Sequence, residues 1–208
     1  MEYLKDPAAI YEKSFQTIRS EVDLARVPED IQPLAIRLMH ASGMTDLTDD
    51  LRYSTDVAKA ARDALVDGGN IITDCQMAAA GIIRRLLPAS NQVVCTLNDP
   101  QTPLLAAKAQ TTRSAAAVEL WEKHLNASVV VIGNSPTTLF ALLERLDRAP
   151  ERPAAILAFP VGFVGAAESK EALHANPRGV PYVTLLGRRG GSAMAGAAVN
   201  AIAAGASR

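Results

Sequence analysis

The hydrophobic pattern of the chain changes once, near residue 70. Before that point apolar residues recur at helical spacing, and after it short apolar runs alternate with segments of helix length. The runs are IITD (71–74), QVVCTL (92–97), SVVVIG (128–133), AAILAF (154–159) and PYVTLL (181–186). Runs without polar alternation indicate strands buried on both faces. The sequence therefore predicts an α/β fold: three α/β/α layers, a roughly five-stranded, mainly parallel sheet and an N-terminal helical segment.

Three helices are predicted before the sheet begins. Asp6 followed by Pro7 is typical of a helix start, with an N-cap and a proline at the first helical position. A second helix covers 31–43 and ends at a glycine, and a third covers 54–68. The polar, acidic segment 45–53 between them predicts a loop or lid.

His40 lies on the inner face of the second predicted helix. Ile36, Met39 and His40 are spaced i, i+3 and i+4, so the three side chains share one face of the helix. An imidazole that exchanges protons near neutral pH is a candidate acid or base, while a structural histidine in the core is the alternative. Ser14, one turn from two isoleucines of the first helix, either faces a cleft or bonds to its own helix backbone.

The segments after the predicted strands are rich in glycine and polar residues. They are 74–76, 98–100, 133–138, 162–165 and 187–192. Ligands of parallel sheets bind outside the carboxyl ends of the strands, where helix N-termini offer N–H groups to anions. We therefore expect carboxylates or phosphates there, although ordinary turn chemistry explains any single turn. Asp74 and Met77 are expected at one pocket edge, with Gly191 and Ser192 in another of these turns.

A further anion-binding corner is expected at Thr112 and Arg113. Thr112 is placed to cap a helix that continues over 114–125, and Arg113 then stands in its first turn. A cation in that position opposes the helix dipole. Such a placement suggests a binding role, and a solvated surface arginine is the equal alternative.

Composition narrows the class of protein. A length of 208 residues predicts one domain, 1–208, and a net charge of −1 argues against a nucleic-acid partner. The chain has no apolar run of membrane-spanning length and no basic, apolar leader, so we expect no membrane partner and a cytoplasmic location. Cys75 and Cys95 are expected to be reduced, and no cysteine or histidine cluster has metal-ligand spacing.

Several common motifs are absent. VVVIGNSPTT (129–138) resembles a strand-to-helix turn of a dinucleotide fold but lacks G-x-G-x-x-G, and no segment matches G-x-x-x-x-G-K-[ST]. No G-x-S-x-G elbow is present either. These absences disfavour nucleotide-binding sites and simple hydrolases.

Six segments, in order along nearly the whole chain, resemble the precorrin-8X methylmutase family. They are AIYEKSFQTIRSE (9–21), RLMHASG (37–43), TRSAAA (112–117), GNSPTTLF (133–140), PVGFVGAAESK (160–170) and GRRGGSAMAGAA (187–198). The most specific combination is PVGFVGAAESK together with the inward histidine and the final GGSAM block.

The resemblance implies an isomerase of corrin biosynthesis that moves a methyl group from C-11 to C-12 of ring C. The product is hydrogenobyrinate, or cobyrinate when cobalt is already in the ring, and neither a methyl donor nor another cofactor is used. The family histidine matches His40, implied to protonate or hydrogen-bond the ring. Ser14 and Arg113 match positions that line the same site, with Arg113 pairing a substrate carboxylate.

The implied partners are an anionic tetrapyrrole substrate and product, and a second copy of the chain in a homodimer with shared sites. Together with the turn residues, the predicted substrate-binding set is Ser14, Arg113, Thr112, Asp74, Met77, Gly191 and Ser192. A carrier that binds a tetrapyrrole without converting it is one alternative hypothesis. A nucleotide-dependent transferase is another, and thermal stabilisation by ATP, NAD or S-adenosylmethionine would support it.

Overall fold

Helices and strands alternate along the chain from residue 51 onward, in a computed structural model that describes residues 1–206. The α-helices are α1 (Pro7–Glu21), α2 (Gln32–Ser42), α3 (Val57–Val66), α4 (Gln76–Ala80), α5 (Thr102–Ala109), α6 (Arg113–Ala116), α7 (Glu122–Leu125), α8 (Pro136–Arg148), α9 (Ala166–Ala175) and α10 (Ser192–Ala206). Short 3-10 helices are η1 (Leu24–Arg26), η2 (Asp46–Asp49), η3 (Arg84–Leu86) and η4 (Ala117–Trp121). The strands are β1 (Leu51–Tyr53), β2 (Ile71–Thr73), β3 (Val93–Val94), β4 (Val129–Ile132), β5 (Ala155–Ala158) and β6 (Tyr182–Leu185).

The strands form one sheet in the order β1-β6-β5-β4-β2-β3. All neighbouring pairs are parallel except β1 with β6. Successive side chains of a strand point to opposite faces, so Val129 and Val131 enter one core while Val130 and Ile132 enter the other. The five predicted strands and their parallel arrangement are confirmed.

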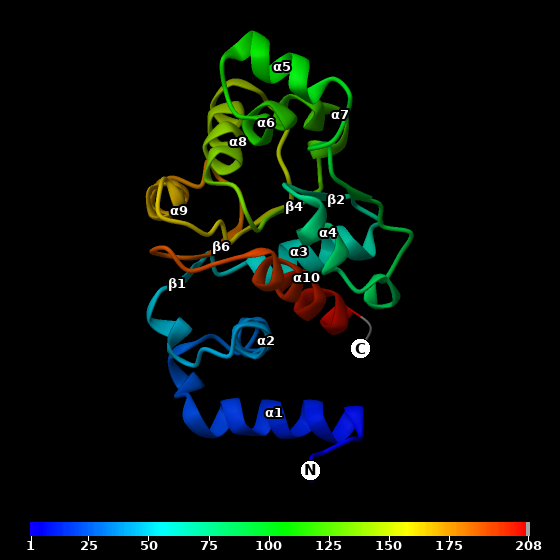
Figure 1. The fold of residues 1–208 in the computed structure, drawn as a ribbon, viewed down its shortest axis with the longest axis vertical. Helices are drawn as coiled ribbons and strands as arrows, with labels where there is room; N and C mark the ends of the chain where they lie inside the picture. Colours follow the sequence, from blue (N-terminus) through cyan, green and yellow to red (C-terminus); the bar gives the residue numbers. More distant parts are fainter. Residues whose placement is uncertain (207–208) are drawn as a thin grey trace.

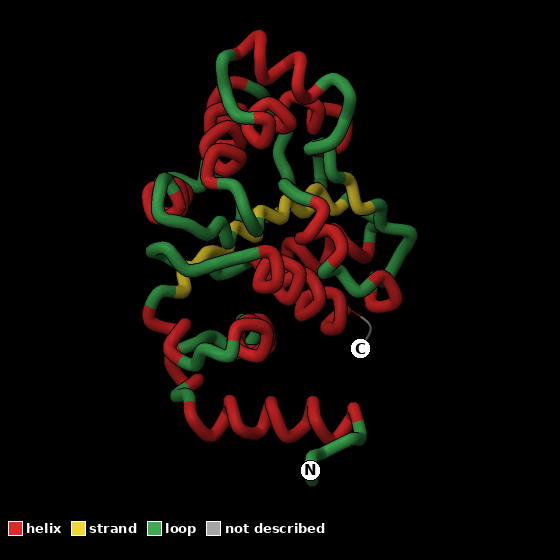
Figure 2. Tube along the Cα trace, viewed as in Figure 1, coloured by secondary structure: helices red, strands yellow, loops and turns green. Residues whose placement is uncertain are grey.

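Two helical layers enclose this sheet, and the first two helices extend one of them (Figure 1). Helices α7, α8 and α9 cover one face, with α5 and α6 outside them, while α3 and α10 cover the other. Helix α2 packs on α10, and α1 packs on α2 at the end of the molecule. Figure 2 shows the strands as one band with helices on both sides. The predicted three-layer α/β fold with an N-terminal helical segment is confirmed.

The prediction of a loop or lid over 45–53 is wrong for its last three residues. Leu51 pairs with Leu185 and Tyr53 with Val183, which adds an antiparallel strand at the edge of the sheet. Leu51 is buried in the core below the sheet. A three-residue strand is too short to show a hydrophobic period, and β1 forms its hydrogen bonds with β6, which is distant in sequence. The local sequence therefore does not predict it.

Helix boundaries depend on caps, and the expected limits at Asp6 and Gly43 hold. The Asp6 side chain accepts a hydrogen bond from the Ala9 N–H at 3.0 Å, and Gly43 ends α2 in the left-handed conformation. The expected start of the third helix at Ser54 is wrong, because α3 begins at Val57. The Ser54 hydroxyl instead accepts a hydrogen bond from the Tyr182 N–H at 3.0 Å.

The single helix expected over 114–125 is also wrong, because the segment is divided into α6, η4 and α7. The Thr96 hydroxyl donates to the carbonyl of Ala117 at 2.9 Å and accepts from the Trp121 indole at 2.9 Å. These buried bonds from the loop after β3 bend the segment into 3-10 geometry. Within residues 1–206, no helix is both long and apolar enough to cross a bilayer.

Candidate functional site

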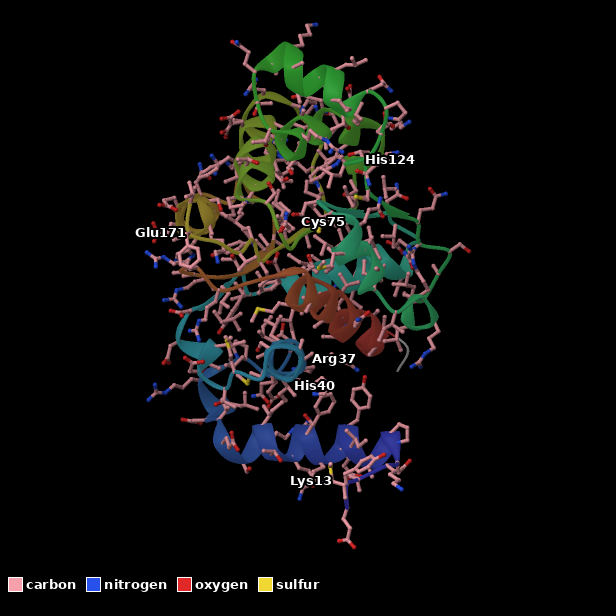
Figure 3. The ribbon with its side chains drawn as sticks, in the orientation of Figure 1. Lys13, Arg37, His40, Cys75, His124 and Glu171 are labelled. Atoms are coloured by element: carbon pink, nitrogen blue, oxygen red, sulfur yellow. The ribbon has the colours of Figure 1, made fainter. Side chains whose placement is uncertain are left out.

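His40 and Ser14 meet between α2 and α1, where Figure 3 shows the imidazole facing the first helix. The Ser14 Oγ lies 2.8 Å from His40 Nδ1. The rings of Tyr11 and Phe15 stand 5.2 and 5.3 Å from the imidazole centroid. The serine and the aromatic rings hold the imidazole in place, and its Nε2 makes no hydrogen bond within residues 1–206.

Two hollows adjoin this pair through residues 43–45. One, of about 260 Å³, is lined by Ser14, Thr17, Ile18, Glu21, Met39, His40, Gly43 and Thr45. The other, of about 240 Å³, is lined by Met44, Val161, Gly162, Phe163, Arg188, Arg189, Gly190 and Met194. Phe163 is 84% exposed, with the Arg188 guanidinium 5.2 Å from its ring centroid. This second hollow therefore has an apolar floor bordered by a cation, and Met44 in its lining is the neighbour in sequence of Gly43 and Thr45 in the first.

The turn that carries Arg188 is held from two sides. From α9, the fully buried Lys170 donates a hydrogen bond from Nζ to the Arg189 carbonyl at 2.6 Å. The Arg189 side chain pairs with Asp46 at 2.7 Å and Asp50 at 2.5 Å. Burial lowers the pKa of Lys170 to about 8.

Asp74 lies at the end of β2 and holds the turn after β4. Its Oδ1 accepts from the Gly133 N–H at 2.9 Å, and its Oδ2 from the N–H groups of Asn134 and Ser135 at 2.8 and 2.7 Å. The carboxylate is buried. These three N–H groups are therefore occupied by an internal anion, contrary to the expectation that they bind a ligand.

Thr112 and Arg113 begin α6 as the sequence predicts. The Thr112 hydroxyl accepts from the Ala115 N–H at 3.1 Å, which confirms its role as a cap. Arg113 Nη2 donates to the Leu97 carbonyl and to Asn98 Oδ1, both at 3.0 Å. The exposed Nε and Nη1 make no hydrogen bond within residues 1–206, so one edge of the guanidinium is open to an anion.

The remaining expected site residues cluster where α4 and α10 begin. Ser192 Oγ lies 3.3 Å from Cys75 Sγ, and the Gly191 N–H donates to the Phe159 carbonyl at 2.8 Å. Met77 on α4 is exposed. Burial raises the pKa of the Cys75 thiol, which makes it a poor nucleophile, and both cysteines are unpaired within residues 1–206.

Comparison with known proteins identifies the family. The family model described as CbiC, precorrin-8X methylmutase, matches residues 9–204. The chain belongs to this family. It is 57% identical over 203 residues to a precorrin-8X methylmutase of Pseudomonas aeruginosa, covering 98% of each chain. It is 40% identical to a cobalt-precorrin-8 methylmutase of Salmonella typhimurium, covering 97% of each.

The structural comparison agrees. A precorrin-8X methylmutase from Thermus thermophilus superposes with a TM-score of 0.86 at 35% identity, covering 96% of both chains. The resemblance noted in the sequence is thus confirmed, and the chain is an isomerase of cobalamin biosynthesis.

The methylmutase fold brings some of the expected residues together and keeps others apart. Ser14 and His40 form one pair below α10, whereas Thr112 and Arg113 lie across the sheet (Figure 1). Lys170 and Arg188 received no individual role from the sequence. Both lie in segments that carry the family resemblance, and Arg188 also lies in the turn 187–192, one of those expected to bind anions.

Proposed function

We propose that this chain converts precorrin-8X to hydrogenobyrinate, with His40 as the general acid. The observation that carries the proposal is the 2.8 Å hydrogen bond between Ser14 Oγ and His40 Nδ1. In the protonated imidazole both ring nitrogens donate, so Nδ1–H bonds to Ser14 while Nε2–H is free for the substrate. The bond from C-11 to the methyl carbon breaks as the bond to C-12 forms. The proton returns to His40 at the end of the cycle.

The substrate is a flat ring with many carboxylate arms, and the hollow formed by Met44 and the turns 161–163 and 188–190 suits both features. Phe163, Val161 and Met44 offer an apolar face, and Arg188 stands at its border. We propose Ser14, Arg113, Thr112, Met77, Gly191 and Ser192 as substrate-binding residues. Asp74 is not retained as a contact, because its oxygens already accept three N–H groups and its charge repels carboxylates.

We further propose a homodimer in which each site combines His40 and Ser14 of one chain with Arg113 of the other. Support comes from the separation of these groups within one chain (Figure 1). Exposed apolar side chains on α1, among them Ile10 and Tyr11, also favour burial against a second copy.

The family match over 9–204 supports a single domain across 1–208, of which 207–208 lie outside the described residues. Unpaired cysteines, one of them buried, support a cytoplasmic location. We propose the metal-free ring as natural substrate, because the 57% identical relative is named for precorrin-8X and the cobalt enzyme of Salmonella typhimurium is 40% identical.

The visible absorption spectrum of the protein incubated with precorrin-8X tests the proposed reaction. We expect the parent to form the hydrogenobyrinate chromophore and His40→Ala to bind the ring while converting it at least about 100-fold more slowly. His124 lies on α7, across the sheet from His40 (Figure 3), so His124→Ala is the matched control and should convert normally.

Wild-type turnover by His40→Ala would contradict the general-acid role. Binding without conversion by the parent would favour a carrier, and conversion of the cobalt-containing ring alone would reassign the substrate.

A further inference from the structure

A continuous run of hydrogen bonds links the end of β2 to the helix that displays Arg113. It starts at Asp74, whose carboxylate is 2% exposed and accepts three backbone N–H groups from the turn after β4. Bonds from N–H groups to a buried carboxylate are about twice as strong as neutral ones. The turn 133–135 is thereby fixed to β2.

The same turn opens α8 and fixes its first residues. Ser135 Oγ accepts from the Thr138 N–H at 3.3 Å and lies 2.9 Å from Thr137 Oγ1. Ser135 and Thr138 are buried. The orientation of both threonine side chains therefore depends on the turn that Asp74 holds.

Both threonines then reach across to α6. Thr137 Oγ1 lies 2.7 Å from Thr112 Oγ1, and Thr138 Oγ1 donates to the Ser114 carbonyl at 3.1 Å. Helix α6 is four residues long, too short to be stable by itself, so its place depends on external contacts. Thr112 and Ser114 flank Arg113, so the two bonds fix the backbone on either side of it.

We propose that Asp74 and Thr137 are positioning residues that set where Arg113 meets a carboxylate of the substrate. The inference rests on the proposed function, in which Arg113 binds that carboxylate. In this role both residues act through Arg113, without a contact of their own to the substrate. The bonds of Arg113 Nη2 to Leu97 and Asn98 tether the tip of the side chain, whereas the hydrogen bonds through Thr137 locate its base. A small displacement of a binding group is enough to weaken binding.

The test is a double-mutant cycle between Thr137→Val and Arg113→Ala, with KM and kcat measured for all four proteins. Valine keeps the shape of threonine and removes the hydroxyl bonds. We expect Thr137→Val to raise KM about fivefold with kcat changed less than about twofold, since only binding is affected. In the Arg113→Ala background the same change should raise KM no further, because no guanidinium remains to be displaced.

Two further variants complete the series. Thr137→Ser keeps the hydroxyl and should restore the wild-type KM, and Thr55→Val, at an exposed threonine before α3, should change neither constant. Asp74→Asn should raise KM more than Thr137→Val, because an amide nitrogen then faces backbone N–H groups. If Asp74→Asn fails to fold, the Thr137 variants still test whether the position of Arg113 depends on these hydrogen bonds.

An equal rise in KM in both backgrounds would overturn the inference, because Thr137 would then act without Arg113. An unchanged KM in Thr137→Val together with a raised KM in Arg113→Ala would overturn the positioning role of Thr137 and leave the binding role of Arg113 intact. An unchanged KM in Arg113→Ala would overturn the binding role of Arg113 and this inference together.

Discussion

Single residues carry several features of this methylmutase that its sequence pattern does not reveal. Lys170 lies in α9, a short helix with charged residues on several sides, and nothing in its spacing marks the lysine as buried. The inward placement of His40 is predictable from its helical face. Its hydrogen bond to Ser14 is not predictable, because the two residues are 26 positions apart in the sequence. Local periodicity gives the direction of a side chain but not its partner.

The buried lysine predicts an unusual dependence of stability on pH. Its pKa is about 8 in the folded protein and about 10.5 when the lysine is exposed on unfolding. Between these values the unfolded chain binds more protons, so the free energy of unfolding contributed by Lys170 rises with pH. We expect wild type to gain stability relative to Lys170→Met between pH 8 and 10.5, measured by urea unfolding.

The same substitution at exposed Lys59 on α3 controls for the loss of a surface charge. If the difference between wild type and Lys170→Met were constant across this range, the lysine would not titrate in the folded protein as its burial implies.

At the scale of elements, patterns buried on both faces are the most predictable. The five parallel strands follow from their apolar runs, whereas β1 and the division into α6, η4 and α7 depend on partners distant in sequence. Leu51 is in a strand only because it pairs with β6, and the bend near Ala117 depends on the hydrogen bond from Thr96. Thr112 was identifiable as a cap because a cap bonds to residues close in sequence. The role of Asp74 was not identifiable, because a turn whose N–H groups bind an internal carboxylate has the same sequence pattern as a turn that binds a ligand.

The junction between β5 and the turn before α10 requires a glycine at one position. A Cβ at Gly190 would lie 2.2 Å from the Phe159 carbonyl oxygen and 2.8 Å from that of Pro160. We expect Gly190→Ala to lower the free energy of unfolding by about 3 kcal/mol, measured by urea unfolding, because backbone must move to relieve the overlap.

Gly187→Ala is the matched control in the same turn. Gly187 has φ +76° and open space around it, so alanine there should cost about 1 kcal/mol from backbone strain alone. Equal losses at the two positions would mean that the close approach at Gly190 relaxes without cost.

At the scale of the whole molecule, the site residues are divided between the two sides of the sheet. If each site takes His40 from one chain and Arg113 from another, variants that are defective at these two positions complement one another. At a substrate concentration far below the raised KM of Arg113→Ala, a refolded equimolar mixture of His40→Ala and Arg113→Ala should regain about a quarter of wild-type activity, because half of the dimers are mixed and each has one intact site.

A mixture of His40→Ala with Ser14→Ala is the control for this experiment. Both changes fall on the same half of the site, so mixing should give no more than the mean of the two parents. Absence of recovery in the first mixture would place the complete site within one chain.

The carboxylate of Asp74 affects which other ligands can bind to this enzyme in a cell. Its place between β2 and β4, where the strand order reverses, is the crevice at which parallel sheets commonly take nucleotide phosphates. A phosphate arriving there meets N–H groups already bound by a buried anion, and displacing that anion leaves it without partners at a cost of several kcal/mol. We therefore expect this turn to offer no phosphate site to metabolites such as ATP.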